Sequence, residues 1–183
     1  QRFGTVIGFT PEQLGEETAD QLKQLSIVAS LPPLQRPNLT RVDDIDESLT
    51  KRARSYLHAN CAHCHHQGGG GATVFDLSYH LPLKRTKLLG LPPAQGDFDL
   101  ENARVVAPGD PYRSVLLYRM AKQGNGRMPH LGSRRIDTAG LKLIHDWIAN
   151  MPLDETGRSP ERLGQVSTQQ KQIHLLGLAK NDK

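Results

Sequence analysis

The chain has 183 residues, of which 37% are hydrophobic and only 5% aromatic, and its formal net charge is +4. This composition is thin for one domain of that length, so we expect segments that lie along a surface, or a core completed by something other than side chains. No stretch approaches the ~18 consecutive apolar residues of a membrane-spanning helix, so no transmembrane segment is predicted. The positive clusters, such as Lys84, Arg85 and Lys87, have no aromatic residues between them that could stack on bases, and nucleic-acid binding is therefore not expected.

Residues 1–45 are predicted to form an N-terminal extension. A Thr-Pro pair at Thr10 marks the start of a helix that continues to about Val28. Residues 31–37 are rich in proline, which breaks the helix and indicates an extended linker. The chain begins at Gln1 without the basic start and apolar core of a signal peptide, so we expect either a removed signal or a longer parent polypeptide.

A second helix is predicted from about Asp46 to Asn60. Its apolar residues recur at helical spacing and form one stripe that runs into Cys61, namely Leu49, Ala53, Tyr56 and Leu57. The glycines of 68–71 then break the chain. In Thr73–Tyr79 apolar and polar residues alternate, which predicts a short strand, and residues 103–106 are the expected partner strand of a β-hairpin.

Two further helices are predicted after this insertion. Asp110 followed by Pro111 is typical of a helix start, and the buried face is expected to be Tyr112, Leu116, Leu117 and Met120. The last helix is predicted to start at Asp137 and to stop at Pro152, and its apolar face is Leu141, Ile144, Trp147, Ile148 and Met151. Residues 154–183 are a polar tail.

The only two cysteines lie in the pentapeptide Cys61-Ala62-His63-Cys64-His65. This C-x-x-C-H pattern is the one used for covalent haem attachment. At the end of a helix, residues three apart lie on one side, so both thiols can reach the vinyl groups along one porphyrin edge, and His65 can then ligate the iron. The alternatives are free buried thiols, a redox-active thiol pair, and a zinc site that draws further ligands from His58, His63, His65 and His66.

Met128 is the expected sixth ligand of such an iron. It lies in a loop between two helices and is followed by a proline that can present the thioether, whereas Met120 and Met151 lie on buried helix faces. His130 is the nearest alternative ligand and His80 a more distant one. An open sixth position would indicate catalysis or gas binding instead.

Together these features resemble a class I-type cytochrome c domain. The resemblance covers residues 46–153 and rests on the helix before Cys61, the haem motif, the Met128 loop and the last helix with Trp147. The Pro108-Gly109-Asp110-Pro111 run also resembles haem domains that end larger secreted bacterial oxidoreductases. The resemblance implies a mainly α, cytochrome c-like fold in which the first and last helices cross, with the β-hairpin insertion and the two terminal arms as additions.

The function expected from this resemblance is one-electron transfer by a single covalent haem c in the bacterial periplasm or outside the cell. The partner would be a redox protein or a fused or associated dehydrogenase, and the chain itself is not expected to be an enzyme. The haem-burying residues are expected to be Leu116, Leu117, Met120 and Leu131. The alternative is the catalytic or sensing haem part of a larger oxidoreductase, with an open or bis-His iron.

Overall fold

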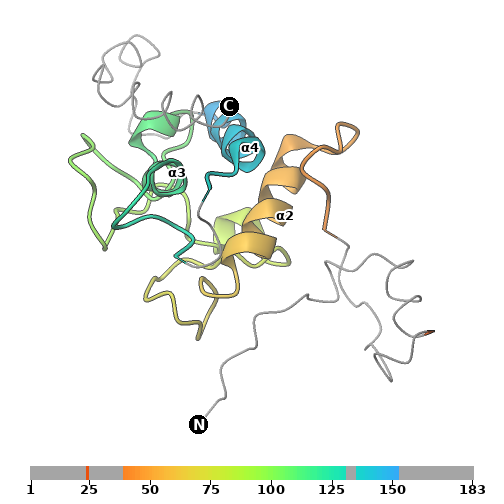
Figure 1. Ribbon diagram of the computed structural model, residues 1–183, viewed down its shortest axis with the longest axis horizontal. Helices are drawn as coiled ribbons and strands as arrows, with labels where there is room; N and C mark the ends of the chain where they lie inside the picture. The colour runs from red at the N-terminus through yellow and green to blue at the C-terminus, as the bar shows by residue number, and fades with distance from the viewer. Residues whose placement is uncertain (1–23, 25–38, 131–134, 153–183) are drawn as a thin grey trace.

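The structure is a computed structural model that describes residues 24, 39–130 and 135–152. These residues form the helices and turns that Figure 1 traces from α2 to α4, and among them there is no β-strand. The elements in chain order are α2 (Leu49–Cys61), the 3-10 helices η2 (Leu83–Arg85) and η3 (Pro111–Arg113), α3 (Val115–Ala121) and α4 (Thr138–Ala149). A mainly α architecture is therefore confirmed for this part of the chain.

Helix α2 begins at Leu49, three residues after the predicted start at Asp46, and Ser48 is its N-cap. The Ser48 hydroxyl accepts a hydrogen bond from the backbone N–H of Lys51 at 3.3 Å and so satisfies one of the free donors of the first turn. Ala53 and Leu57 are completely buried, which confirms that the predicted apolar stripe faces the core. The helix ends at Cys61, so the first cysteine is the last residue of its final turn.

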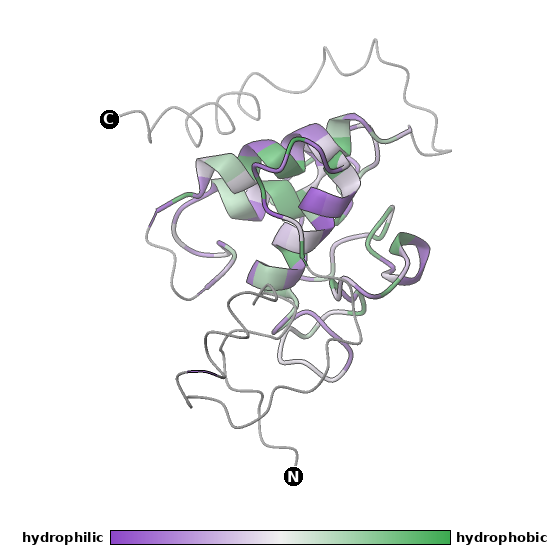
Figure 2. Ribbon diagram, turned by 90° about the vertical axis from the view of Figure 1, so that its right-hand side faces the viewer, coloured by the Kyte–Doolittle hydropathy of each residue, from purple (hydrophilic) through white to green (hydrophobic). Residues whose placement is uncertain are grey.

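Helix α4 matches its prediction closely. The Asp137 carboxylate caps it by accepting the backbone N–H of Gly140 at 3.0 Å. Its buried face is Leu141, Leu143, Ile144, Trp147 and Ile148. Figure 2 shows that apolar residues gather where the helices meet, and this is the centre of the core.

The predicted helix after Asp110 is interrupted. Asp110 accepts hydrogen bonds from the N–H groups of Tyr112 and Arg113, but the turn that follows is the 3-10 helix η3. Ser114 then adopts an extended conformation, because both of its neighbours bond to the backbone of Arg104. The Arg104 N–H donates to the carbonyl of Arg113, and the N–H of Val115 donates to the carbonyl of Arg104. The α-helix proper, α3, starts only after this residue.

The β-hairpin prediction is wrong. The backbone N–H of Asp76 donates to Thr86 and that of Leu77 donates to His65, so Thr73–Tyr79 bonds to two different loops instead of one partner strand. Residues 103–106 do not pair with it either, since their isolated bridges join Leu89 to Val106 and Arg104 to Ser114. Burial does not follow the alternation either, since the neighbouring residues Leu77 and Ser78 are both buried.

Helices α2 and α4 cross at Tyr56 and Gly140, and this contact confirms that the two helices pack together. A Cβ atom at Gly140 would clash with the ring and the hydroxyl of Tyr56, so this side chain occupies the space that a side chain at residue 140 would fill. Leu57 and Trp147 belong to the same core cluster on either side of this crossing.

The predicted terminal arms, 1–45 and 154–183, and the helix expected from Thr10 lie almost entirely outside the described residues. In the part that is described, none of the helices has the length and apolar character needed to cross a membrane.

Substituting Gly140 by alanine should destabilise the fold. Overpacking of this kind costs about 1–3 kcal/mol and outweighs the roughly 1 kcal/mol that alanine gains from helix propensity. We expect G140A to lower the melting temperature. When Tyr56 has been truncated to alanine, we expect the same substitution to lower it less. The matched control is Gly70→Ala, where a new Cβ has no neighbour within 4 Å. Equal melting temperatures for G140A and G70A would contradict this packing.

The ion pair between Asp110 and Arg113 should be a major stabilising contact. Its N–O distance is 2.9 Å, and the two side chains are only 7% and 6% exposed. Asp110→Ala leaves the guanidinium without this carboxylate, and we expect a loss of about 3–5 kcal/mol in the free energy of unfolding by urea titration. Asp110→Asn keeps the cap and should lose less, whereas removing the exposed Glu47 of the Lys51 pair should change the midpoint little.

Candidate functional site

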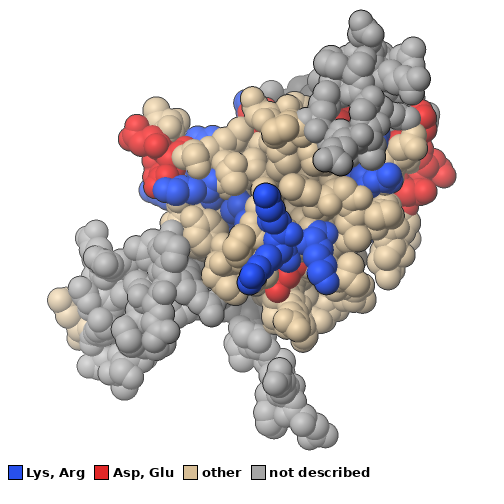
Figure 3. All heavy atoms as spheres, turned by 180° about the vertical axis from the view of Figure 1, so that it is seen from behind, with Lys and Arg blue, Asp and Glu red and all other residues tan. Residues whose placement is uncertain are grey.

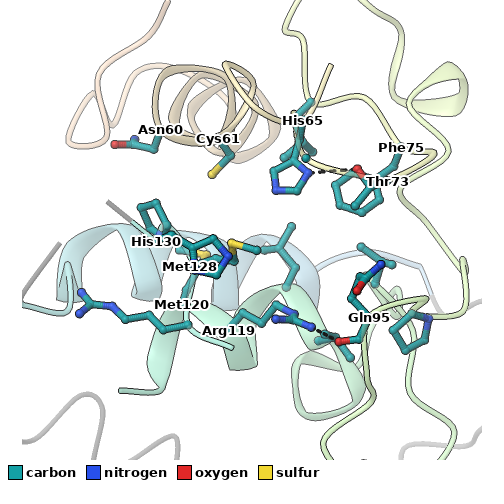
Figure 4. A pocket seen from close by; sticks show the side chains of 18 of the residues that line it. Asn60, Cys61, His65, Thr73, Phe75, Gln95, Arg119, Met120, Met128 and His130 are labelled. Carbon is teal, nitrogen blue, oxygen red and sulfur yellow. Dashed lines mark hydrogen bonds between the residues drawn. The ribbon is translucent and has the colours of Figure 1, made fainter. Parts of the chain in front are cut away.

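A cavity of about 1180 Å³ opens between the C-x-x-C-H segment and the loop that follows α3. It is larger than the roughly 300–1,000 Å³ of ordinary small-molecule pockets, so it can take a bulky ligand. Figure 4 shows its two walls, with the C-terminal end of α2 on one side and α3 and the Met128 loop on the other. Much of the lining is apolar and includes Leu77, Leu91, Val105, Val115, Leu116 and Met120.

The first wall carries two of the three motif residues expected to hold haem. Cys61 and His65 both line the cavity, and Figure 4 shows the thiol and the imidazole pointing into it. The turn after α2 brings them together, because the backbone N–H of His65 donates to the carbonyl of Cys61 at 2.9 Å. Cys64 is exposed and lies outside the described lining.

The His65 ring is held on three sides. Its Nδ1 lies 3.0 Å from the Thr73 hydroxyl, and the ring stacks on Phe75 with centroids 5.1 Å apart. A Cβ at Gly71 would come within 2.7 Å of Nδ1, so only glycine allows the backbone to approach the ring this closely. When Nδ1 donates to Thr73, Nε2 is left with a free lone pair, as in metal-ligating histidines whose second nitrogen is fixed by a hydrogen bond.

The protonation of His65 and Cys61 also bears on what the site can bind. Burial lowers the pKa of His65, with smaller contributions from nearby positive groups including Arg119, and so favours the neutral imidazole that binds metals. Burial raises the pKa of the Cys61 thiol to about 12, so the thiol stays protonated near neutral pH. This makes Cys61 a poor attacking thiol for a redox-active pair, because the attacking thiol of such a pair needs a lowered pKa.

The zinc alternative loses support as well. It requires about four ligands of the His, Cys or carboxylate type. Across residues 39–130 and 135–152, no three such side chains gather closely enough to hold a metal ion.

The second wall carries Met128, as predicted for the opposite ligand. The loop is tied to α3 through the Met128 N–H, which donates to the Arg119 carbonyl at 3.0 Å, and Pro129 follows through a cis peptide bond. Figure 4 shows Met128 across the cavity from Cys61 and His65, with Met120 and His130 close by. The cavity therefore has an imidazole on one wall and thioethers on the other.

The remaining predicted site residues divide into three groups. Leu116 and Met120 line the cavity, whereas Leu117 is fully buried in the core and is not part of the lining. Leu131 lies outside the described residues. His130 lines the cavity, and the more distant alternative His80 does not.

Sequence reasoning missed several residues of the site. Thr73 and Phe75 had been placed on a strand, although they orient and cover His65. The sequence predicts only a packing role for Tyr56 and no site role for the arginines of the second wall, although all of them line the cavity. One sequence signal could have indicated the role of Thr73. This residue follows the motif closely, after a run of glycines that lets the chain turn back.

No family model, curated protein or solved structure matches the chain. What the site can bind therefore has to be judged from its own geometry.

The two cysteines of the haem-free chain should differ in reactivity. Cys64 is exposed, whereas the Cys61 thiolate is disfavoured until the pH approaches 12, so iodoacetamide at pH 8 should modify Cys64 first. Because the pKa of Cys61 is raised in the folded state, the fold also loses stability as the pH rises from about 8.5, the unfolded value, towards 12.

Peptide mass spectrometry of protein expressed without haem maturation measures the two rates. The Cys64→Ser variant serves to follow Cys61 alone, and unfolding in urea should bring the rates of the two thiols together. Equal rates in the folded protein would contradict the environment described for Cys61.

Proposed function

We propose that the chain carries one covalent haem c and transfers single electrons. The observation that supports this most directly is the apolar cavity with the Cys61 thiol and the His65 imidazole on one wall and the Met128 loop on the other. Cys61 and Cys64 would hold the haem covalently, and His65 and Met128 would bind its iron. The bound haem would supply an iron that alternates between Fe(III) and Fe(II).

The two cysteines suit attachment along an edge of the ring. In each thioether the sulfur bonds to one vinyl carbon and the thiol hydrogen adds to the other, so no oxidant is consumed. Cys61 lines the cavity, whereas Cys64, three residues on, is exposed and lies outside the described lining. This arrangement fits a flat ligand that is buried on most sides and has one edge near solvent.

The surrounding residues would orient the ligands and exclude water. Thr73 and Phe75 would hold the ring of His65 in place, and the apolar lining would give the low dielectric that tunes a reduction potential. Met ligation raises the potential relative to His ligation. A carrier with a relatively high potential is therefore the function that this ligand set favours.

One observation supports a second ligand set. His130 lines the cavity beside Met128, so a bis-His iron is the alternative, and it would fit the haem part of a larger oxidoreductase. Under this alternative the chain would serve in catalysis or sensing within the larger protein.

The proposed partners are a periplasmic redox protein or a dehydrogenase module. Figure 3 shows a face on which Lys and Arg side chains gather near the centre and acidic side chains lie mostly towards the edges. Such a face would attract an acidic partner, and salt should slow that association. The proposed location outside the cytoplasm follows from the resemblance and from where bacteria attach haem c.

The test is expression in a host that matures c-type cytochromes in its periplasm. We expect a red protein whose mass exceeds that of the chain by one haem that acid–acetone extraction does not remove. The oxidised form should be low-spin and show the weak far-red charge-transfer band of Met-ligated haem. Met128→Ala should abolish this band and lower the reduction potential.

Met120→Leu is the matched control, because it removes the other methionine of the same wall and should keep the band. Persistence of the band in M128A would overturn the assignment of Met128. If the wild-type spectrum lacks the band and changes on His130→Ala, the bis-His alternative is correct. A colourless protein with two free thiols would contradict haem binding altogether.

A further inference from the structure

The cavity has an excess of positive charge that the proposed iron ligands do not explain. Among its described lining residues there are three arginines, Arg119, Arg127 and Arg135, and one acidic side chain, Asp137. A guanidinium beside an apolar cavity is costly to desolvate unless an anion or several hydrogen-bond acceptors compensate it.

Asp137 does not provide that compensation. Its carboxylate caps α4 through the Gly140 N–H at 3.0 Å and also interacts with the Tyr56 hydroxyl. Where the structure describes the chain, arginine forms ion pairs in Arg41–Asp43 and Arg113–Asp110, and none of the cavity arginines takes part in one.

Arg127 has one guanidinium donor that no described residue satisfies. Its Nη1 donates to the Gln123 side chain at 3.1 Å and its Nη2 to the Arg135 carbonyl at 2.9 Å. Its Nε is buried, and no described residue accepts a hydrogen bond from it. The guanidinium is thus oriented by neutral groups and retains a donor for a further ligand.

Arg119 is also held by neutral partners. Its guanidinium donates to the carbonyls of Gly126, at 2.8 Å, and Gln95, and it lies 4.6 Å from the centre of the Phe98 ring. These contacts fix the group at the cavity, as Figure 4 shows, but leave its charge without an anion.

We propose that Arg127, supported by Arg119, binds a carboxylate of the ligand that fills the cavity. Guanidinium groups pair with carboxylates through parallel N–H donors, and this pairing would give the Arg127 Nε its missing acceptor. The inference rests on the proposed function, under which the carboxylate is a haem propionate. Arg127 would then be a positioning residue that orients the haem and stabilises its reduced state by adding positive charge.

The test uses matured, haem-loaded protein and three variants. Arg127→Gln removes charge and donor geometry, Arg127→Lys keeps the charge but not the planar fork, and Arg85→Gln removes one exposed charge from η2 as a matched control. The readouts are the propionate bending bands in the resonance Raman spectrum and the reduction potential. The Raman bands report on the propionates themselves. They therefore show whether a propionate or a free anion is bound at the arginine.

We expect R127Q to shift a propionate band and to lower the potential. R127K should shift the band but keep a potential closer to that of the wild type, and R85Q should change neither. The proposal would be overturned if R127Q and R127K had the same propionate bands and the same reduction potentials as R85Q. The pyridine haemochrome spectrum is recorded for every protein, and a wild type without covalent haem would overturn the proposed function and this inference with it.

Discussion

The crossing of α2 and α4 at Tyr56 and Gly140 is the constraint on which the rest of the site depends. Helix α2 ends at Cys61 and α4 starts after Asp137, and both of these residues line the cavity, so the crossing fixes the position of the first wall relative to the start of α4. Because residue 140 has no side chain, the Tyr56 ring can lie directly on the α4 backbone. Burial, with a smaller contribution from Asp137, raises the pKa of Tyr56, so the phenol stays neutral at this junction.

The features that the sequence predicted well are those decided by neighbouring residues. The Asp137 cap and the apolar stripes of α2 and α4 depend on contacts within one or two turns, and they occur where they were expected. The approach of His65 to Cys61 follows from the turn at the end of a helix in the same way. Local patterns of this kind determine the backbone conformation without help from distant residues.

The features that could not be predicted depend on partners far along the chain. The alternation in Thr73–Tyr79 predicted a strand, but a strand needs one continuous partner, and the two loops that accept its hydrogen bonds are not encoded in that segment. Ser114 interrupts a strong helix signal because the distant Arg104 bonds to its neighbours. The unsatisfied Nε of Arg127 is likewise a property of the assembled cavity and has no sequence signature.

The two proposed axial ligands differ in how they are supported. His65 is held by Thr73, Phe75 and Gly71, which follow closely on the segment that carries both cysteines, whereas Met128 lies in a separate loop that bonds to α3. Local openings in proteins cost less free energy than global ones, and separate segments can open independently. The order of ligand loss under mild denaturation therefore follows from the chain's connectivity: the Met128 side of the iron would be released first, while the His65 side stays attached to the segment that carries both cysteines.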